Sequence, residues 1–449
     1  MVNRMVARVV LAAALVASIG IAPARQAAAQ SKEPMPMVDA TSSMNGIAER
    51  YVRLALAVGE HDPLYVDAYF GPEEWRARAK EEKKSLADIE LEAIPLVAEL
   101  NRLDLSKTEE MVRLRRSFLV KQLESLAART RILRGAAYAF DEESSALFDI
   151  VAPPFDEGYY RATLARLDSL LPPGEGTLLD RYDRLRSDYV IPGDRVAAVF
   201  DAAIAEARAR TKAHIALPEG ESFTVEYVKG KSWGAYNWYQ GAYRSVIQIN
   251  TDLPKYIDSP VGLACHEGYP GHHVQNVLFE QRLVKERGWV EFTVAPLFSP
   301  LSPINEGGAN FGIAVAFPGE ERLAFERRVL YPLAGLDPSK AELYDEVEKL
   351  VRKLGSAENE AARRYLNGEI GAEDAVRFLS EYALMSVERA RKLVTFFDQY
   401  RSYVVNYNCG QDAVEAYVDS RGGTAGEPEK RWKELTALIS EPRVPSELK

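Results

Sequence analysis

Apolar residues recur at three- and four-residue spacing through most of the chain, which is the periodicity of amphipathic α-helices. The clearest stretches are residues 196–213, residues 372–397 and the segment that follows Asp337-Pro338 and ends at Gly355. Proline at the first helical position and glycine after the last turn are typical helix boundaries. The pattern therefore predicts a mainly α protein.

Patterns typical of β-strands are confined to one short region. Residues 222–228 (SFTVEYV) and 245–250 (SVIQIN) alternate in polarity or carry β-branched side chains, and an aromatic-rich connector lies between them. We expect a small sheet directly before a histidine-rich segment. The mature chain is divided into an N-terminal helical region (30–215) and a catalytic, metal-binding region (216–449), which we expect to form one continuous helical unit.

The amino-terminal residues have the order of a targeting segment. Arg4 and Arg8 precede an apolar run at 9–22, and small residues at 27–29 offer a cleavage point after Ala29. This order is typical of a secretory signal peptide at 1–29, and the apolar run is too short to span a bilayer comfortably. We expect an exported, periplasmic or secreted protein with no membrane span in its mature form.

Charge and cysteine content narrow the classes of partner. The formal net charge is −10, and it becomes −13 without residues 1–29, which hold three of the 56 basic residues and none of the 66 acidic ones. An acidic surface disfavours nucleic acid and anionic membranes as partners. With only two cysteines, Cys265 and Cys409, a cysteine-rich zinc module is excluded. An oxidising compartment would permit one bridge between them.

Three of the five histidines lie in the segment HEGYPGHH, residues 266–273. Ser259-Pro260 is a typical N-cap and first helical position, which predicts that His266 and Glu267 lie on a helix. In zinc hydrolases a glutamate beside the first histidine ligand serves as the general base. A polar helix end that binds no metal is the alternative interpretation of the same residues.

The position four residues after the first histidine, where the second ligand normally lies, holds Pro270. Its ring, followed by Gly271, should break or bulge the helix. Two looped-out residues would bring His272 to the missing place, whereas on an unbroken helix His273 would lie about 10 Å from the first histidine. We favour His272 and keep His273 as an alternative ligand. Glu306, at the predicted start of another helix, would complete a catalytic set of two histidines and one glutamate.

The decamer HEGYPGHHVQ (266–275) resembles the His-Glu-x-x-Pro-Gly-His-His-x-Gln signature of the bacterial domain-of-unknown-function 885 family. That family is similar to zinc metallopeptidases of the gluzincin type. Residues 306–309 and 408–418 resemble its Glu-Gly-Trp-Ala and Pro-Gly-Gln-Ala segments, although Gly308 replaces the tryptophan and the family's Asp-x-x-x-His segment is missing. The resemblance covers most of 220–420. It implies a large helical zincin-like fold, a small sheet edging the active-site cleft, and one zinc ion per chain.

Other candidate site residues lie on both sides of the histidine segment. The resemblance implies that an edge strand before the histidines, ending near Asn250, pairs with extended substrate. A hydroxyl of Tyr403 or Tyr407, which share a helical face, would donate to the oxyanion of a tetrahedral intermediate. Arg401 would hold a substrate carboxylate. A structural role in a helix is equally compatible with each of these three side chains.

The sequence thus predicts an exported zinc metallopeptidase that hydrolyses peptides or peptide-like substrates with Glu267 as general base. Two alternatives remain. One is a non-catalytic metal-binding or scaffolding protein, and the other is a metal-dependent hydrolase of esters or cell-wall amides. The presence of Glu267 favours catalysis, because a binding role needs no general base.

Overall fold

Helices hold most of the described residues in the computed structural model, and strands hold few, so the predicted mainly α class is confirmed. The structure describes residues 40–231 and 233–448. The predicted signal peptide at 1–29 lies outside the described residues. The described residues form one unit by their contacts. Within the described part, no helix is both long and apolar enough to cross a membrane.

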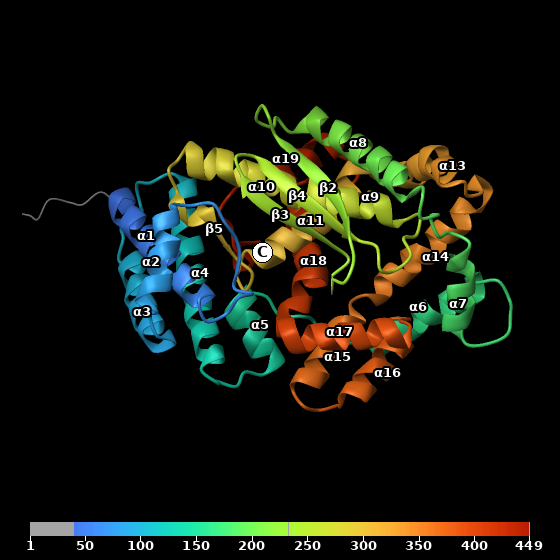
Figure 1. Ribbon diagram of the computed structural model, residues 1–449, viewed down its shortest axis with the longest axis horizontal. Helices are drawn as coiled ribbons and strands as arrows, with labels where there is room; N and C mark the ends of the chain where they lie inside the picture. Colours follow the sequence, from blue (N-terminus) through green and yellow to red (C-terminus); the bar gives the residue numbers. More distant parts are fainter. Residues whose placement is uncertain (1–39, 232, 449) are drawn as a thin grey trace, which may run out of the picture. The chain divides into compact units, whose positions relative to one another are not determined.

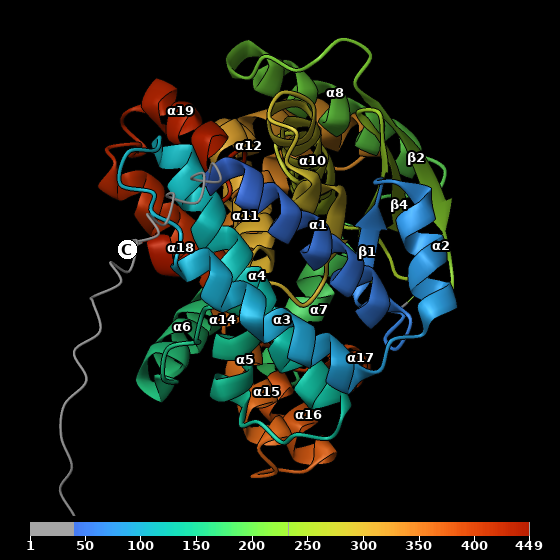
Figure 2. The same ribbon diagram turned by 90° about the vertical axis from the view of Figure 1, so that its left-hand side faces the viewer.

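Helices α1–α7, which precede α8 and the main sheet, contribute to one buried apolar core. Helix α1 packs against α3 and α4, and α4 packs against α5 (Figure 2). Their facing sides carry buried residues such as Tyr51, Leu96 and Leu123. The predicted helix at 196–213 is confirmed as α8. The helices of this part are α1 (Ala40–Gly59), α2 (Glu73–Glu82), α3 (Leu86–Asn101), α4 (Glu110–Leu133), α5 (Phe140–Phe148), α6 (Glu157–Leu170), α7 (Leu178–Ser187) and α8 (Val196–His214).

The later helices follow the predicted pattern with one correction. The apolar periodicity at 372–397 belongs to two helices, because Leu384 has a φ of 52° and the Ser386 side chain caps a new helix by accepting from the N–H of Arg389. The helices of this part are α9 (Ser259–Leu263), α10 (His272–Leu278), α11 (Ser302–Ala316), α12 (Glu321–Phe325), α13 (Tyr331–Ala334), α14 (Ala341–Leu354), α15 (Ala357–Leu366), α16 (Ala372–Tyr382), α17 (Val387–Tyr400), α18 (Val405–Ser420) and α19 (Pro428–Leu438).

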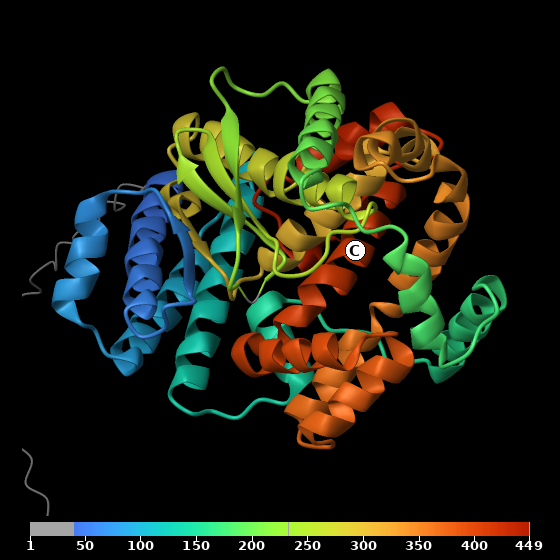
Figure 3. The same cartoon turned by 45° about the vertical axis from the view of Figure 1, so that its right-hand side comes forward.

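Two small sheets lie among these helices. Strands β1 (Val66–Tyr69) and β5 (Val294–Pro296) form an antiparallel pair. The other sheet has the order β2-β4-β3, with β2 (Ser222–Val228) parallel and β3 (Ala235–Gly241) antiparallel to β4 (Arg244–Asn250). Figures 1 and 3 show this sheet beside α10, which contacts both β3 and β4.

The predicted strands at 222–228 and 245–250 are confirmed, but the connector between them is itself strand β3. Its hairpin turn consists of Ala242 and Tyr243, both with positive φ. Such two-residue turns normally carry Asn-Gly or Asp-Gly, so the usual signal was missing. Because β4 is the central strand, its predicted role as the edge strand is wrong. The outer strands are β2 and β3.

Helix α18 contributes to two buried apolar clusters at once. Val405 and Cys409 belong to the cluster built mainly from the amino-terminal helices and α14–α17, whereas Val414 and Val418 belong to the cluster around α8–α11 and α19. A helix that packs in both clusters cannot shift without disturbing each of them, because protein interiors are close-packed. Tyr407, in the first turn of α18, and Tyr403, in the 3-10 turn directly before it, are therefore held in fixed relation to α11.

Candidate metal centre

The histidine segment contains the predicted helix break. Helix α9 starts at Ser259, one residue before the expected first position, and the chain widens to a π-helical segment at Ala264–Gly268. The next three residues are not helical, and α10 begins at His272. Gly271 folds back so closely that a Cβ there would lie 2.0 Å from the carbonyl oxygen of His266. Glycine is therefore required at this position for steric reasons.

The break brings His272 beside His266, and α11 supplies Glu306 to the same place. The ligand atoms of these three side chains all lie within 4.8 Å of one another. Nε2 of His266 lies 3.3 Å and Nε2 of His272 3.7 Å from Oε2 of Glu306. A tetrahedral ion bound at about 2.0–2.1 Å places its ligand atoms about 3.3 Å apart. The spacing therefore suits a zinc ion, with a fourth position left over.

The Glu306 carboxylate supports this assignment. Its Oε2 is buried and makes no hydrogen bond of acceptable geometry within the described residues, although both imidazoles point nitrogen atoms at it. Burial disfavours the charged carboxylate, but its interactions with His266 and His272 outweigh burial and lower its pKa. Burial likewise opposes the charged form of His266, yet Glu306 and Glu267 raise its pKa to about 9. Ligand atoms that converge without hydrogen bonds fit a cation between them.

Two side chains orient the ligands. Asn310 Oδ1 lies 2.9 Å from Nδ1 of His266, and the hydroxyl of Tyr403 donates to Oε1 of Glu306 at 2.8 Å. Such partners fix the rotamers of metal ligands. Asn310 follows Glu306 by four residues on α11, so the two share a helical face. Asn310 was not among the predicted site residues, although this spacing could have indicated it.

Glycines allow a close approach of α11 and α18, which lie side by side in Figure 1. A Cβ on Gly307 would lie 2.2 Å from the carbonyl carbon of Gly410, and one on Gly410 would lie 2.3 Å from the oxygen of Pro303. The segments 306–309 and 408–418 therefore meet in space. A Cβ on Gly308 would lie 3.1 Å from the side chain of Ile439, so a larger residue there, such as the tryptophan of the family pattern, would require Ile439 to shift.

Glu267 lies in the π-helical segment beside the first ligand and is 6% exposed. Its pKa is raised, mainly by burial, while the neighbouring histidines oppose the shift. Asn237 of β3 donates from Nδ2 to the carbonyl oxygen of Glu267 at 2.7 Å. The outer strand of the sheet is thus attached directly to the predicted general base.

The predicted oxyanion donors differ in their surroundings. The Tyr403 hydroxyl already donates a hydrogen bond to Glu306. The hydroxyl of Tyr407 makes no hydrogen bond within residues 40–231 and 233–448, and the charges of Glu306 and Glu267 act on it. Burial first, and these carboxylates second, raise its pKa well above the usual value, so it stays protonated. Tyr407 is therefore the better placed of the two hydroxyls to serve as a donor.

Two predicted site residues point elsewhere. Nε of Arg401 lies 2.6 Å from Oε2 of the buried Glu143, so its guanidinium is paired within the protein. His273 is fully buried, with Nδ1 2.9 Å from Ser245 and Nε2 3.2 Å from Glu221. The alternative ligand His273 is corrected: its ring nitrogens face Ser245 and Glu221, so it does not join the ligand group. The pairing of Arg401 Nε with Glu143 disfavours its predicted role as a carboxylate clamp.

Cys265 and Cys409 are both buried and free, so the bridge that an oxidising compartment would permit is not formed. Cys265 packs in the cluster around α8–α11, whereas Cys409 packs in the other cluster and receives a hydrogen bond from Asn359 Nδ2 at 3.4 Å. Because the two cysteines belong to different apolar clusters, their thiols lie in separate environments.

Asp67 on β1 is a half-buried acid that the sequence analysis missed. It accepts a hydrogen bond from the hydroxyl of Tyr236 on β3. Burial raises its pKa to about 7, and the charges that act on it are those of His272, Glu306 and Glu267. Among the described residues, no lysine or arginine is a leading cause of the pKa shifts of Asp67, Glu267 and Glu306. The surroundings of the ligand group are therefore acidic.

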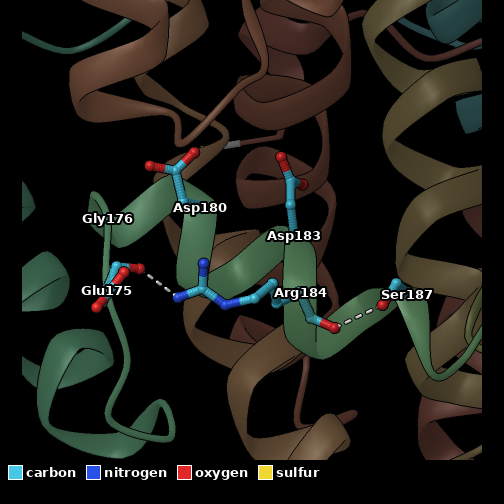
Figure 4. Close-up of a pocket in the computed structure, with 6 residues that line it drawn as sticks. All are labelled: Glu175, Gly176, Asp180, Asp183, Arg184 and Ser187. Atoms are coloured by element: carbon cyan, nitrogen blue, oxygen red, sulfur yellow. Dashed lines mark hydrogen bonds between the residues drawn. The ribbon is translucent and has the colours of Figure 1, made fainter.

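A surface depression of about 580 Å³ on α7 and the loop before it has no part in this centre (Figure 4). Its walls carry several carboxylates and one guanidinium, and none of its residues belongs to the ligand group. The lining residues are Glu175, Gly176, Asp180, Asp183, Arg184 and Ser187.

The sequence matches no family model and no curated protein. Similar solved structures are a "putative lipoprotein" from Colwellia psychrerythraea (14% identity, TM-score 0.49) and a "putative lipoprotein of unknown function" from Shewanella oneidensis (14%, 0.42). The first alignment covers 79% of this chain but spans only 64% of the Colwellia chain, and the second covers 83% and 74%. A third structure, "CHT", is 11% identical over 90% of this chain and 92% of its own, with a TM-score of 0.44. These values assign neither a family nor an activity.

Proposed function

We propose that this protein is a zinc-dependent hydrolase that cleaves peptides or peptide-like amides. The observation that carries the proposal is the convergence of His266, His272 and Glu306, with ligand atoms within 4.8 Å, beside a buried Glu267. Two histidines and one glutamate with an open fourth position are typical of catalytic rather than structural zinc sites. The resemblance of residues 266–275 to gluzincin-like proteins supports the same activity.

Glu267 and Tyr407 have separate roles in the proposed hydrolysis. A zinc ion bound there would act as a Lewis acid and would make a water molecule that it holds more acidic. Glu267 accepts the proton of the attacking water, whose oxygen bonds to the substrate carbonyl carbon, and passes that proton to the departing amine nitrogen. The raised pKa of Glu267 makes its carboxylate a stronger base. Tyr407 donates to the carbonyl oxygen as negative charge develops on it.

The small sheet offers a place for the substrate backbone. β3 is an outer strand, and Asn237 connects it to the backbone of Glu267. Oδ1 of Asn237 is buried and lacks a hydrogen-bond partner within the described residues, so it is an unused acceptor beside the general base. An extended peptide added to β3 would gain backbone hydrogen bonds without a requirement for particular side chains.

Metal analysis and peptide hydrolysis test the proposal together. Purified wild-type protein should hold about one zinc per chain, and His266→Ala should lose it because three ligands become two. Glu267→Gln should keep the zinc but lose roughly 10²–10⁴-fold in turnover, since only the base is removed. Undiminished hydrolysis by Glu267→Gln would refute the mechanism. Full zinc without hydrolysis of any peptide, ester or amide would favour a non-catalytic metal protein instead.

A further inference from the structure

A buried polar cluster includes residues on both sides of His272 in the chain and takes no part in the proposed chemistry. Its centre is Glu221, directly before β2, whose side chain is 1% exposed. Oε1 accepts from Arg208 Nη2 at 2.7 Å, and Oε2 accepts from the hydroxyl of Tyr269 at 2.7 Å. Nε2 of the fully buried His273 lies 3.2 Å from the same Oε2. Lys212 Nζ also lies 3.5 Å from Oε1, so four side chains share this one carboxylate.

The proton positions follow from the partners. Burial opposes ionisation of Glu221, but its bonds with His273, Arg208 and Tyr269 lower its pKa to about 2, so it is a carboxylate at neutral pH. A carboxylate only accepts hydrogen bonds, so Nε2 of His273 carries the proton. The other ring nitrogen, Nδ1, lies 2.9 Å from Ser245 Oγ, within hydrogen-bond distance. Every polar atom of the imidazole is therefore used, and its orientation is fixed.

The cluster binds residues on both sides of the ligand His272. Tyr269 lies three residues before His272, in the helix break, and His273 lies one residue after it, in the first turn of α10. The rings of Tyr269 and Phe223 pack edge-on against the His273 ring, with centroids 5.4 and 5.2 Å away. Both segments that flank His272 are thus tied to the same carboxylate.

His272 needs this support more than the other ligands do. Asn310 orients His266 and Tyr403 orients Glu306. For the His272 side chain, the part of the chain that the structure describes supplies no hydrogen bond, and Oε2 of Glu306 lies 3.7 Å from its Nε2. It also follows a non-helical break, so regular helix geometry does not fix its place relative to His266.

We infer that Glu221, acting through Tyr269 and His273, is a positioning residue that sets the place of His272 in the metal centre. The inference rests on the proposed metal site and adds a buried anchor to it. The anchor acts on the backbone around the ligand rather than on the imidazole itself. Its loss should therefore change metal geometry as well as metal affinity.

Glu280 provides a matched control. It is also a buried carboxylate, 4% exposed, that accepts from a buried tyrosine hydroxyl (Tyr239, 2.5 Å) and pairs with an exposed cation (Lys285, 2.8 Å). It lies eight residues after His272 and touches neither the break nor the ligands. Glu221→Gln and Glu280→Gln should lower the stability of the metal-free protein alike, because each removes a buried, hydrogen-bonded charge.

The test measures zinc affinity by chelator competition and the visible spectrum of the Co²⁺-substituted protein, which reports ligand geometry. Glu221→Gln should bind zinc roughly 10-fold or more weakly, in the range found for residues that orient metal ligands, and should shift the Co²⁺ bands. Glu280→Gln should keep the wild-type affinity and spectrum. If Glu221→Gln does not fold, Tyr269→Phe removes a single bond of the anchor and should show a smaller shift in the same direction.

Two results would overturn the inference alone. The first is wild-type zinc affinity together with an unchanged Co²⁺ spectrum in Glu221→Gln. The second is an equal loss of zinc affinity in Glu280→Gln, because the loss would then reflect general stability. Wild-type protein that binds neither Zn²⁺ nor Co²⁺ would instead overturn the proposed function itself. The two failures are therefore distinguishable.

Discussion

Replacing Gly271 by alanine tests the geometry of the helix break directly. The new Cβ would lie 2.0 Å from the carbonyl oxygen of His266 and 2.5 Å from that of Cys265, and contacts under 3.0 Å are essentially never seen. Either Gly271 or the ligand-bearing π-helical segment must therefore move by about 1 Å, because both contacts are with backbone atoms that cannot rotate away. Zinc–ligand distances tolerate only about 0.2 Å of error.

The expected result is a loss of metal binding larger than the loss of stability. Zinc affinity should fall roughly 100-fold or more, and overpacking should destabilise the fold by about 1–3 kcal/mol. The control is Gly262→Ala on α9, four residues before His266, where an added Cβ meets nothing within 4 Å. That variant should gain about 0.5–1 kcal/mol of helix stability and keep its zinc.

Zinc affinity by chelator competition, together with thermal unfolding of the metal-free proteins, separates these effects. Wild-type affinity in Gly271→Ala would refute the argument, since it would show that the close approach of this residue to His266 does not determine the ligand positions. A zinc loss in Gly262→Ala as large as that in Gly271→Ala would refute it as well.

Three further predictions concern side chains around the ligands. Tyr407→Phe should lower kcat about 100-fold by removing the oxyanion donor. Arg401→Ala should instead leave kcat unchanged and reduce stability, because its partner Glu143 is left buried without it. Steady-state kinetics and thermal unfolding compare the two variants. Asp67→Asn should raise KM for peptides with a free amino terminus more than for their N-acetylated forms, since it removes a negative charge from acidic surroundings; equal changes for both peptides would contradict this. Because the pKa of Glu221 is lowered from 4.5 to about 2, its ionisation stabilises the fold above pH 4.5, and that contribution, at most about 3 kcal/mol, is lost as the pH falls towards 2. Denaturant unfolding of metal-free wild type and Glu221→Gln should therefore converge at acidic pH, and a constant difference would contradict the assignment.

The sequence determined those features that depend on near neighbours in the chain. Helical periodicity predicted the mainly α class, because one face of each amphipathic helix must be buried whatever covers it. The strands at 222–228 and 245–250 were predicted from their own side chains. β3 was missed because its hairpin turn at Ala242-Tyr243 lacks the residues that normally mark positive φ. The break before His272 was predicted because proline and glycine act locally.

Tertiary packing decided what surrounds the ligands. The sequence alone could not bring α11 to the histidines, since that approach depends on the Gly307–Gly410 contact between helices about one hundred residues apart. It also could not show that Glu143 pairs with Arg401, or that Glu221 binds His273. In the sequence, each of these side chains has several compatible partners. Burial in the folded protein selects one of them, because an unpaired charge or imidazole inside the protein is too unfavourable to persist.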